Sequence, residues 1–136
     1  YRNDMEGGQT NEFRPLILVA EDDDSNFKLI KAIIGKKCDI QWAKNGEEIV
    51  ALFKEYGKEA KAILMDIKMP VMNGLDATKI IREENKEIPI IMQTAYAFSS
   101  DKENAMNAGA SEVLVKPITL SILRGTLTKY FPELVW

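Results

Sequence analysis

The chain has 136 residues, of which 46% are hydrophobic and 29% charged, a composition typical of one ordinary globular domain. A formal charge of −3 gives no reason to expect nucleic-acid binding, no apolar run approaches the roughly 20 residues of a membrane span, and no signal-peptide pattern opens the chain. Histidine is absent, which excludes histidine metal ligands, Ser–His catalytic pairs and a phosphohistidine within this chain.

The first half of the chain alternates polar, apolar and amphipathic segments. Residues 1–14 are polar and glycine-bearing, so we expect a linker or tail. An apolar strand at 16–20 precedes an amphipathic helix at 25–34, which ends at Gly35. A short strand at 38–43 follows. Asn45, with Glu48 three residues later, predicts a capped helix that runs to residue 56.

The second half repeats the alternation three times. An apolar strand ends at Asp66, and a helix is predicted at 74–84. Pro89 is expected to open the fourth strand, where its missing N–H costs least, and Ser100 with Glu103 predicts a capped helix that ends at Gly109. A last strand at 113–115 precedes a helix to about residue 130 with Thr119 as its cap. The residues predicted to face inward from the third helix are Leu75, Ala77, Thr78 and Ile81.

Five β–α repeats with such apolar strands predict an α/β fold in which a parallel sheet is covered on both faces. Right-handed crossovers favour a single doubly wound (βα)5 flavodoxin-like domain with strand order 2-1-3-4-5. We expect this domain to span residues 15–131, with 132–136 as a C-terminal tail.

Several predicted strands end in polar side chains that suit a metal ion and a phosphoryl group. Two or three carboxylates in one crevice repel each other, and Mg²⁺ relieves this with octahedral oxygen coordination. We expect Asp22 and Asp66 to bind Mg²⁺ directly, with the backbone carbonyl of Lys68 as a third ligand and Glu21 acting through outer-shell water. Asp23 and Asp24 are interpreted as helix-capping acids instead.

The same edge of the sheet predicts phosphoryl chemistry. An aspartate can attack a phosphoryl group and form an aspartyl phosphate, a reaction that depends on positioning and on neutralisation of charge. Asp66 would be the nucleophile, Lys116 would neutralise one phosphoryl oxygen, and the Thr94 hydroxyl would donate to another. Each residue alone is weak evidence, but together they stand at the ends of successive strands.

The chain from residue 16 to 130 resembles the receiver domain of two-component response regulators. The resemblance rests on residues 18–22 (LVAED), residues 64–70 (LMDIKMP) followed by Gly74, Thr94-Ala95, and Lys116-Pro117. It implies that Asp66 is phosphorylated, with Mg²⁺, by a phosphohistidine on a sensor histidine kinase or a phosphotransfer protein. It also implies that Thr94 moves toward the phosphoryl group and repacks the fourth helix, fifth strand and fifth helix, residues 99–129, a face that could form a homodimer.

Three positions modify what the resemblance implies. The family often has an aromatic switch residue three positions before the lysine, where this chain has Val113, so coupling to Thr94 is expected to be weaker or carried by the backbone. Lys68 and Tyr96 stand at positions that influence, in the family, how fast water reaches the acyl phosphate. A bulky Tyr96 is therefore expected to slow hydrolysis of the phosphorylated form.

Alternative functions fit the residues less well. A degenerate receiver that serves as a binding module would lack an acid, the threonine or the lysine, and a Mg²⁺-dependent aspartate phosphatase commonly has an acid where this chain has Lys68. A flavodoxin needs a phosphate-binding loop, which the acids at 21–24 would repel.

The wider context also follows from the sequence as an expectation. The run at 94–97 (TAYA), the polar start and Tyr1 in place of a Met favour the C-terminal receiver of a hybrid histidine kinase over a stand-alone receiver. This domain would accept and relay a phosphoryl group without turning over a substrate, although the parent protein would be a kinase. The lone Cys38 fits a reducing compartment, so we expect the cytoplasm, or the cytoplasmic part of a membrane-anchored sensor.

Overall fold

The computed structural model describes residues 13–95 and 100–136, along which five strands and five helices alternate. The strands are β1 (Leu16–Ala20), β2 (Asp39–Ala43), β3 (Ala60–Asp66), β4 (Ile90–Thr94) and β5 (Glu112–Val115). The helices are α1 (Asp24–Ile34), α2 (Gly46–Tyr56), α3 (Gly74–Glu84), α4 (Ser100–Ala108) and α5 (Leu120–Tyr130). Within the described residues, no helix is both long and apolar enough to cross a membrane.

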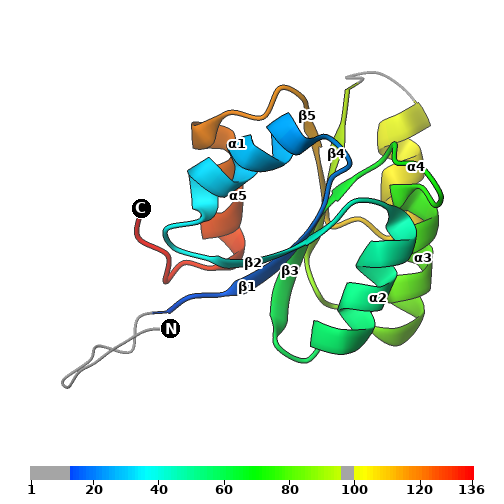
Figure 1. Ribbon diagram of the computed structural model, residues 1–136, viewed down its shortest axis with the longest axis horizontal. Coiled ribbons are helices and arrows are strands. Elements are labelled where there is room, and N and C mark those ends of the chain that lie inside the picture. Colours follow the sequence, from blue (N-terminus) through cyan, green and yellow to red (C-terminus); the bar gives the residue numbers. More distant parts are fainter. Residues whose placement is uncertain (1–12, 96–99) are drawn as a thin grey trace.

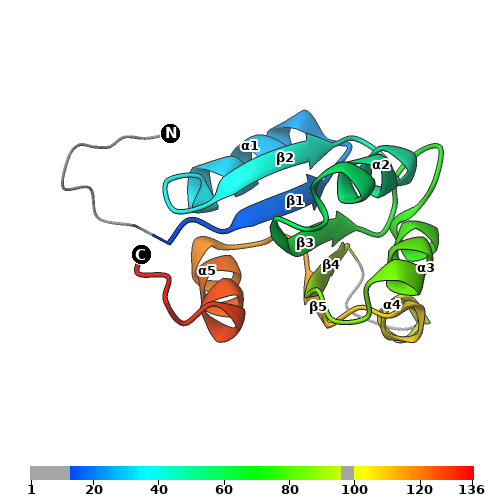
Figure 2. The same cartoon turned by 90° about the horizontal axis from the view of Figure 1, so that it is seen from below.

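The strands form one parallel sheet in the order β2-β1-β3-β4-β5, which confirms the predicted doubly wound topology. Helices α1 and α5 cover one face of this sheet, and α2, α3 and α4 cover the other (Figure 1). The view from below shows the same three layers, with the strands between the two groups of helices (Figure 2). The order places β1 beside β3, so that the residues after both strands meet at one edge.

Alternation along the strands divides the core in two. On β3, Ile63 and Met65 face the α2, α3 and α4 side, whereas Ala62 and Leu64 face the α1 and α5 side. All four are fully buried. Burial of one such large aliphatic side chain stabilises a fold by roughly 1.5–3 kcal/mol, so the β3 strand is held firmly from both faces. The last residue of this strand is Asp66.

Side-chain caps begin four of the helices. The side chains of Asp23, Asn45, Asn73 and Thr119 each accept a hydrogen bond from the backbone N–H three residues later. The caps at Asn45 and Thr119 and the capping role of Asp23 are thereby confirmed. Asn73 was not predicted as a cap. Ser100 lies inside the first turn of α4, and the position before it is outside the described residues.

The predicted boundaries differ from the observed ones by one or two residues. Helix α1 begins at Asp24, one residue earlier than predicted. Strand β2 begins at Asp39, because the Cys38 N–H still bonds to the carbonyl of Ile34 at the end of α1. Strand β4 begins at Ile90, directly after the proline that was expected to open it. Leu75, predicted to face inward, is half-buried and packs against the core.

Residues outside the predicted 15–131 range contact the domain. The ring of Phe13 packs 6.1 Å from that of Phe131, and the Arg14 guanidinium donates to the Lys36 carbonyl at 2.6 Å. At the other end, Leu134 is buried and the Trp136 indole N–H donates to the Thr128 hydroxyl at 3.0 Å. The predicted limits of the domain stay a prediction.

Gly74 lets α3 pass close to the end of β3, and this gives a test of the packing at the site. A Cβ atom at Gly74 would lie 2.2 Å from the Asp66 carbonyl oxygen, whereas one at Gly125, on the exposed side of α5, would meet nothing within 4 Å. We expect Gly74→Ala to lower the free energy of unfolding by about 1–3 kcal/mol, as overpacking does. Gly125→Ala should raise it by up to about 1 kcal/mol, because glycine weakens a helix interior. Urea unfolding of both variants tests the pair, and equal stabilities would contradict this account.

Candidate functional site

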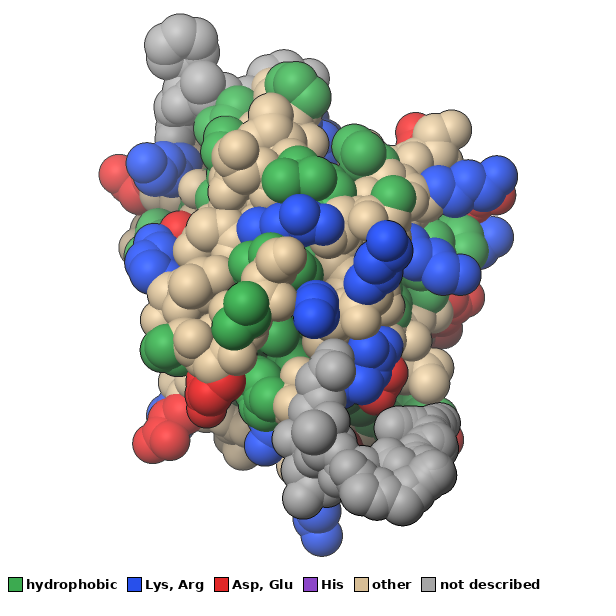
Figure 3. Space-filling view, turned by 90° about the vertical axis from the view of Figure 1, so that its left-hand side faces the viewer, with side chains coloured by type: hydrophobic (Ala, Val, Ile, Leu, Met, Phe, Trp, Pro, Cys, Tyr) green, Lys and Arg blue, Asp and Glu red, His purple; other side chains and the backbone are tan. Residues whose placement is uncertain are grey.

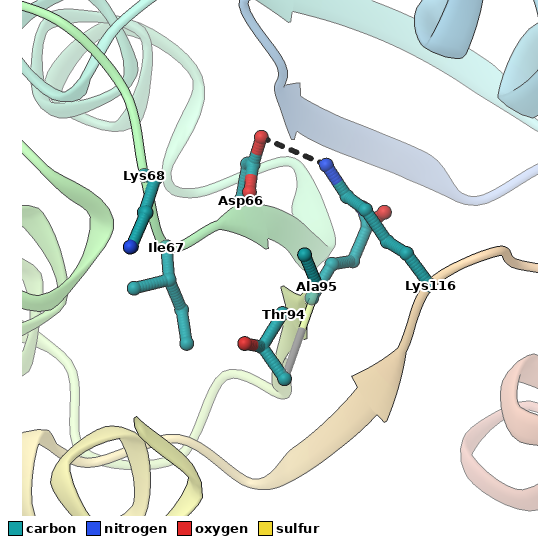
Figure 4. A pocket seen from close by; sticks show the side chains of 7 residues that line it. Asp66, Ile67, Lys68, Thr94, Ala95 and Lys116 are labelled. Carbon is teal, nitrogen blue, oxygen red and sulfur yellow. Dashed lines mark hydrogen bonds and ion pairs between the residues drawn. The ribbon is translucent and has the colours of Figure 1, made fainter. Parts of the chain in front are cut away.

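The polar residues predicted to converge do lie together at the carboxyl edge of the sheet. A pocket there is lined by Asp66, Ile67, Lys68, Gln93, Thr94, Ala95 and Lys116, which come from the ends of β3, β4 and β5 (Figure 4). Asp66 is the last residue of β3 and is only 5% exposed. An open parallel sheet places its chemistry at this edge, beside the point where the strand order reverses.

An ion pair ties Lys116 to Asp66. The Lys116 ammonium lies 3.0 Å from Asp66 Oδ2 and 3.7 Å from Glu21 Oε1 (Figure 4 draws the first contact). Burial alone would lower the pKa of Lys116, but the hydrogen bond to Asp66 and the negative charges of Asp66, Glu21 and Asp22 outweigh it and raise that pKa. Lys116 therefore carries a positive charge at neutral pH.

Three carboxylates meet beside this lysine. One oxygen each from Glu21, Asp22 and Asp66 lie within 4.8 Å of one another. Glu21 is fully buried and accepts from the Asp23 N–H at 3.2 Å and the Asn26 amide at 3.0 Å, whereas Asp22 is exposed. Burial, followed by the charge of Asp66, raises the pKa of Glu21 to about 7. Carboxylates that repel each other at the surface of a cleft suit Mg²⁺.

The loop after β3 is held in a fixed path. The Ile67 N–H donates to the Gln93 carbonyl, and the Met72 N–H donates to the Pro70 carbonyl at 2.7 Å around Val71, which has a φ of 69°. A bond from residue i+2 to residue i is a γ-turn, and its positive φ is strained for a β-branched residue. Lys68 lies at the start of this loop and lines the pocket, and the role of its carbonyl as a metal ligand stays a prediction.

Thr94 connects the pocket to α4. Its side chain is almost fully buried, and its hydroxyl donates to Asp101 Oδ2 in the first turn of α4 at 3.4 Å. Val113 pairs with Met92 in the sheet and packs half-buried against the core on the α4 side. The predicted modulatory residue Tyr96 lies outside the described residues. Thr94 and Val113 thus both face the side of the sheet that α4 covers.

Sequence reasoning missed several residues that shape the site. The Trp42 indole N–H donates to the Glu21 carbonyl at 2.8 Å, and its ring stacks on Phe27 at 4.0 Å. Asn26 holds the Glu21 carboxylate, and Asp101 accepts from Thr94. No local pattern marks these side chains, because their partners lie on other elements of the fold.

Comparisons with known proteins agree with the geometry. Residues 17–128 match the family model described as the response regulator receiver domain. The chain is 41% identical over 129 residues to hybrid signal transduction histidine kinase I of Dictyostelium discoideum, a match that covers 86% of this chain but 7% of that protein.

Solved structures show the same resemblance. The receiver domain of the sensor histidine kinase PA1611 from Pseudomonas aeruginosa, which has magnesium coordinated in its active site cleft, is 30% identical with a TM-score of 0.81. That match covers 88% of this chain and 99% of the other. A chain in the co-crystal structure of the Saccharomyces cerevisiae histidine phosphotransfer protein Ypd1 and the receiver domain of Ssk1 is 28% identical, also with a TM-score of 0.81, over 90% of this chain and 93% of the other.

The raised pKa of Glu21 predicts a pH-dependent stability in metal-free buffer. Between about pH 4.5 and about 7 the folded state holds a proton on Glu21 that the unfolded state has lost, so stability falls as the pH rises through this window. Relative to Glu21→Gln, the wild-type free energy of unfolding should decrease by up to about 3 kcal/mol across it. Urea unfolding at several pH values measures the difference, and parallel curves for the two proteins would contradict it.

Proposed function

Since this chain belongs to the response regulator receiver domain family, and is thus a receiver domain of a two-component phosphorelay, we propose that Asp66 is its phosphoacceptor. The observation that carries this proposal is the 3.0 Å contact between the Lys116 ammonium and the Asp66 carboxylate, beside two further carboxylates. Because Lys116 contacts Oδ2, the other carboxylate oxygen of Asp66 is left to attack phosphorus. The Lys116 ammonium lies close enough to move to the phosphoryl group after the transfer.

In the proposed reaction, one carboxylate oxygen of Asp66 forms a bond to phosphorus while the N–P bond of a partner's phosphohistidine breaks. The leaving imidazole nitrogen keeps the electron pair and takes up a proton. Lys116 then pairs with a phosphoryl oxygen in place of the Asp66 carboxylate. Near-complete burial of Asp66 limits the water that reaches the product.

The acidic residues support a Mg²⁺ site in the same cleft. We propose direct coordination by the carboxylates of Asp22 and Asp66 and the backbone carbonyl of Lys68, with Glu21 acting through outer-shell water. A divalent ion bound there would neutralise charge between the carboxylates and the incoming phosphoryl group. The exposed position of Asp22 suits an ion that keeps several waters.

Thr94 is the proposed link from the phosphoryl group to the surface. To donate to a phosphoryl oxygen its hydroxyl must leave Asp101, which removes a contact with the first turn of α4. Val113 has no hydroxyl or ring to follow Thr94, so the change would pass through α4 and the backbone of β5. The role of Tyr96 in slowing hydrolysis stays a prediction.

The proposal also includes the phosphoryl donor and the longer protein to which this domain would belong. The phosphoryl donor would be a histidine kinase or a histidine phosphotransfer protein, the kind of partner named in the yeast co-crystal structure. The chain spans 7% of the hybrid kinase that it resembles, and we propose a hybrid histidine kinase as its parent. We also propose a cytoplasmic location, which the unpaired, buried Cys38 supports.

The face of the molecule that carries α1, α5 and the C-terminal segment offers a surface for the donor. Figure 3 views this side, where lysine and arginine side chains are spread among hydrophobic ones and acidic side chains lie mainly toward the margins. Leu29 on α1 and Leu120 on α5 are exposed large hydrophobic residues. A mixture of apolar and basic side chains is compatible with docking of a protein partner.

The alternatives explain less of the site. A degenerate receiver needs no intact set of acids, threonine and lysine, yet this chain brings all of them together. A turnover phosphatase would use a carboxylic acid near the position of Lys68, and this chain has no carboxyl side chain there.

Phosphorylation of Asp66 can be tested directly. With Mg²⁺ and acetyl phosphate, intact-mass spectrometry should show the gain of one phosphoryl group, because the small donor needs no docking surface. The gain should disappear in Asp66→Asn and in the presence of a chelator. Asp76→Asn is a matched control, since Asp76 is an exposed aspartate on α3 whose loss should leave the gain unchanged.

A folded wild type that gains no mass from acetyl phosphate should next be offered a phosphorylated histidine phosphotransfer protein. Transfer from that donor would support the proposal with a requirement for the partner. No transfer from either donor would favour the degenerate receiver.

The α4-β5-α5 face supports a further prediction, self-association upon activation. Met106, Val115 and Ile122 are 41–47% exposed there, and Lys129, seven residues after Ile122, pairs with Glu112 of β5 at 2.8 Å. Residues seven apart lie on the same side of a helix, so Ile122 also borders β5.

We expect beryllofluoride with Mg²⁺ to shift the domain toward a dimer in analytical ultracentrifugation. Ile122→Lys should weaken that shift at least tenfold in dissociation constant, because it places an unpaired charge in an apolar contact. Leu29→Lys on α1, outside this face, is the matched control. A monomer under both conditions, or equal effects of the two variants, would rule out this face as the dimer contact.

A further inference from the structure

Gln93 is a buried amide whose polarity the packing does not explain. The residue is 0% exposed, and neither the oxygen nor the nitrogen of its side chain has a hydrogen-bond partner among the described residues. Most buried polar groups in folded proteins are paired, and an unpaired one is unfavourable. An aliphatic side chain would fill the same space without this penalty, so the amide calls for a role outside packing.

The sheet places this amide beside the phosphoacceptor. Gln93 is the register partner of Asp66, one strand away. The residues two positions earlier, Ile91 and Leu64, both pack on the α1 and α5 side, so alternation directs Gln93 and Asp66 to that same side. Thr94, the next residue, faces the opposite side. The amide and the hydroxyl of β4 therefore approach the site from different faces of the sheet.

Lys116 lines the same pocket as this amide. It follows β5, whose Leu114 is the other register partner of Gln93, and its ammonium reaches Asp66 on β3 by crossing β4. An ammonium has three hydrogens to donate. Asp66 and Glu21 hold the ammonium at 3.0 and 3.7 Å, and when it moves away from Asp66 an amide oxygen is a suitable new acceptor for one of its hydrogens.

We propose that Gln93 is a positioning residue for phosphoryl transfer, acting through Lys116. Its side-chain oxygen accepts a hydrogen bond from the Lys116 ammonium when that ammonium leaves the Asp66 carboxylate for the phosphoryl group. The amide would thus hold the lysine in the phosphorylated state. While the Asp66 carboxylate holds the lysine, the amide has no hydrogen-bond partner within residues 13–95 and 100–136. This inference rests on the proposed function of Asp66.

The test compares Gln93→Met, which keeps the length of the side chain but removes the amide, in two backgrounds. In the otherwise wild-type domain, the rate of phosphorylation by acetyl phosphate should fall about tenfold, the effect of one hydrogen bond to a charged group. In Lys116→Met the same change should have no further effect, because residues that act through one another are not additive. Gln41→Met, on the edge strand β2, is the matched control and should leave the rate unchanged.

A spectroscopic measurement separates positioning from a structural role. The side-chain amide signals of Gln93, identified by their loss in Gln93→Met, should shift in ¹H–¹⁵N NMR spectra when beryllofluoride and Mg²⁺ are added. They should not shift in Lys116→Met. Equal rates for wild type and Gln93→Met, an equal loss in both backgrounds, or unmoved signals would overturn the inference. A wild type that takes no phosphoryl group from any donor would overturn the proposed function and this inference with it.

Discussion

The ion pair of Lys116 with two buried carboxylates is the constraint on which the rest of the site depends. Asp66 and Glu21 are both nearly or fully buried, and without a cation between them one would have to stay protonated. Lys116 supplies that cation from the end of β5, 3.0 and 3.7 Å away. It reaches both only because the sheet order sets β1 and β3 side by side and leaves only β4 between β3 and β5.

The charges of the side chains at this edge of the sheet do not cancel, and the net charge is negative. Three carboxylates face one ammonium, and burial together with the charge of Asp66 raises the pKa of Glu21. A bound divalent cation would bring the net charge of this cluster to about zero, so that an incoming phosphoryl group would no longer meet a net negative site. The repulsion between these carboxylates would therefore favour binding of a metal ion and an anion together.

Two faces of β4 carry different parts of the proposed response. Thr94 faces α4, and its hydrogen bond to Asp101 connects the pocket to this helix. Gln93 faces α1 and α5 and lines the same pocket as Lys116. A single strand can thus sense the phosphoryl group on one side and hold the lysine on the other. The absence of an aromatic side chain at Val113 makes this division more important, since it leaves the backbone and α4 to carry the change.

Local patterns in the sequence were enough to predict the helices and strands, their order, and the acids, hydroxyl and lysine at the strand ends. Apolar runs, caps such as Asn45 and Thr119, and glycine stops are local signals, and each is decided by a few neighbouring residues. Only the tertiary structure decided which side chains touch. Trp42 on the Glu21 carbonyl and Gln93 beside Asp66 come from strand register, which joins residues more than 20 positions apart. A pair of this kind leaves no pattern along the chain, because its energy arises only once the sheet has formed.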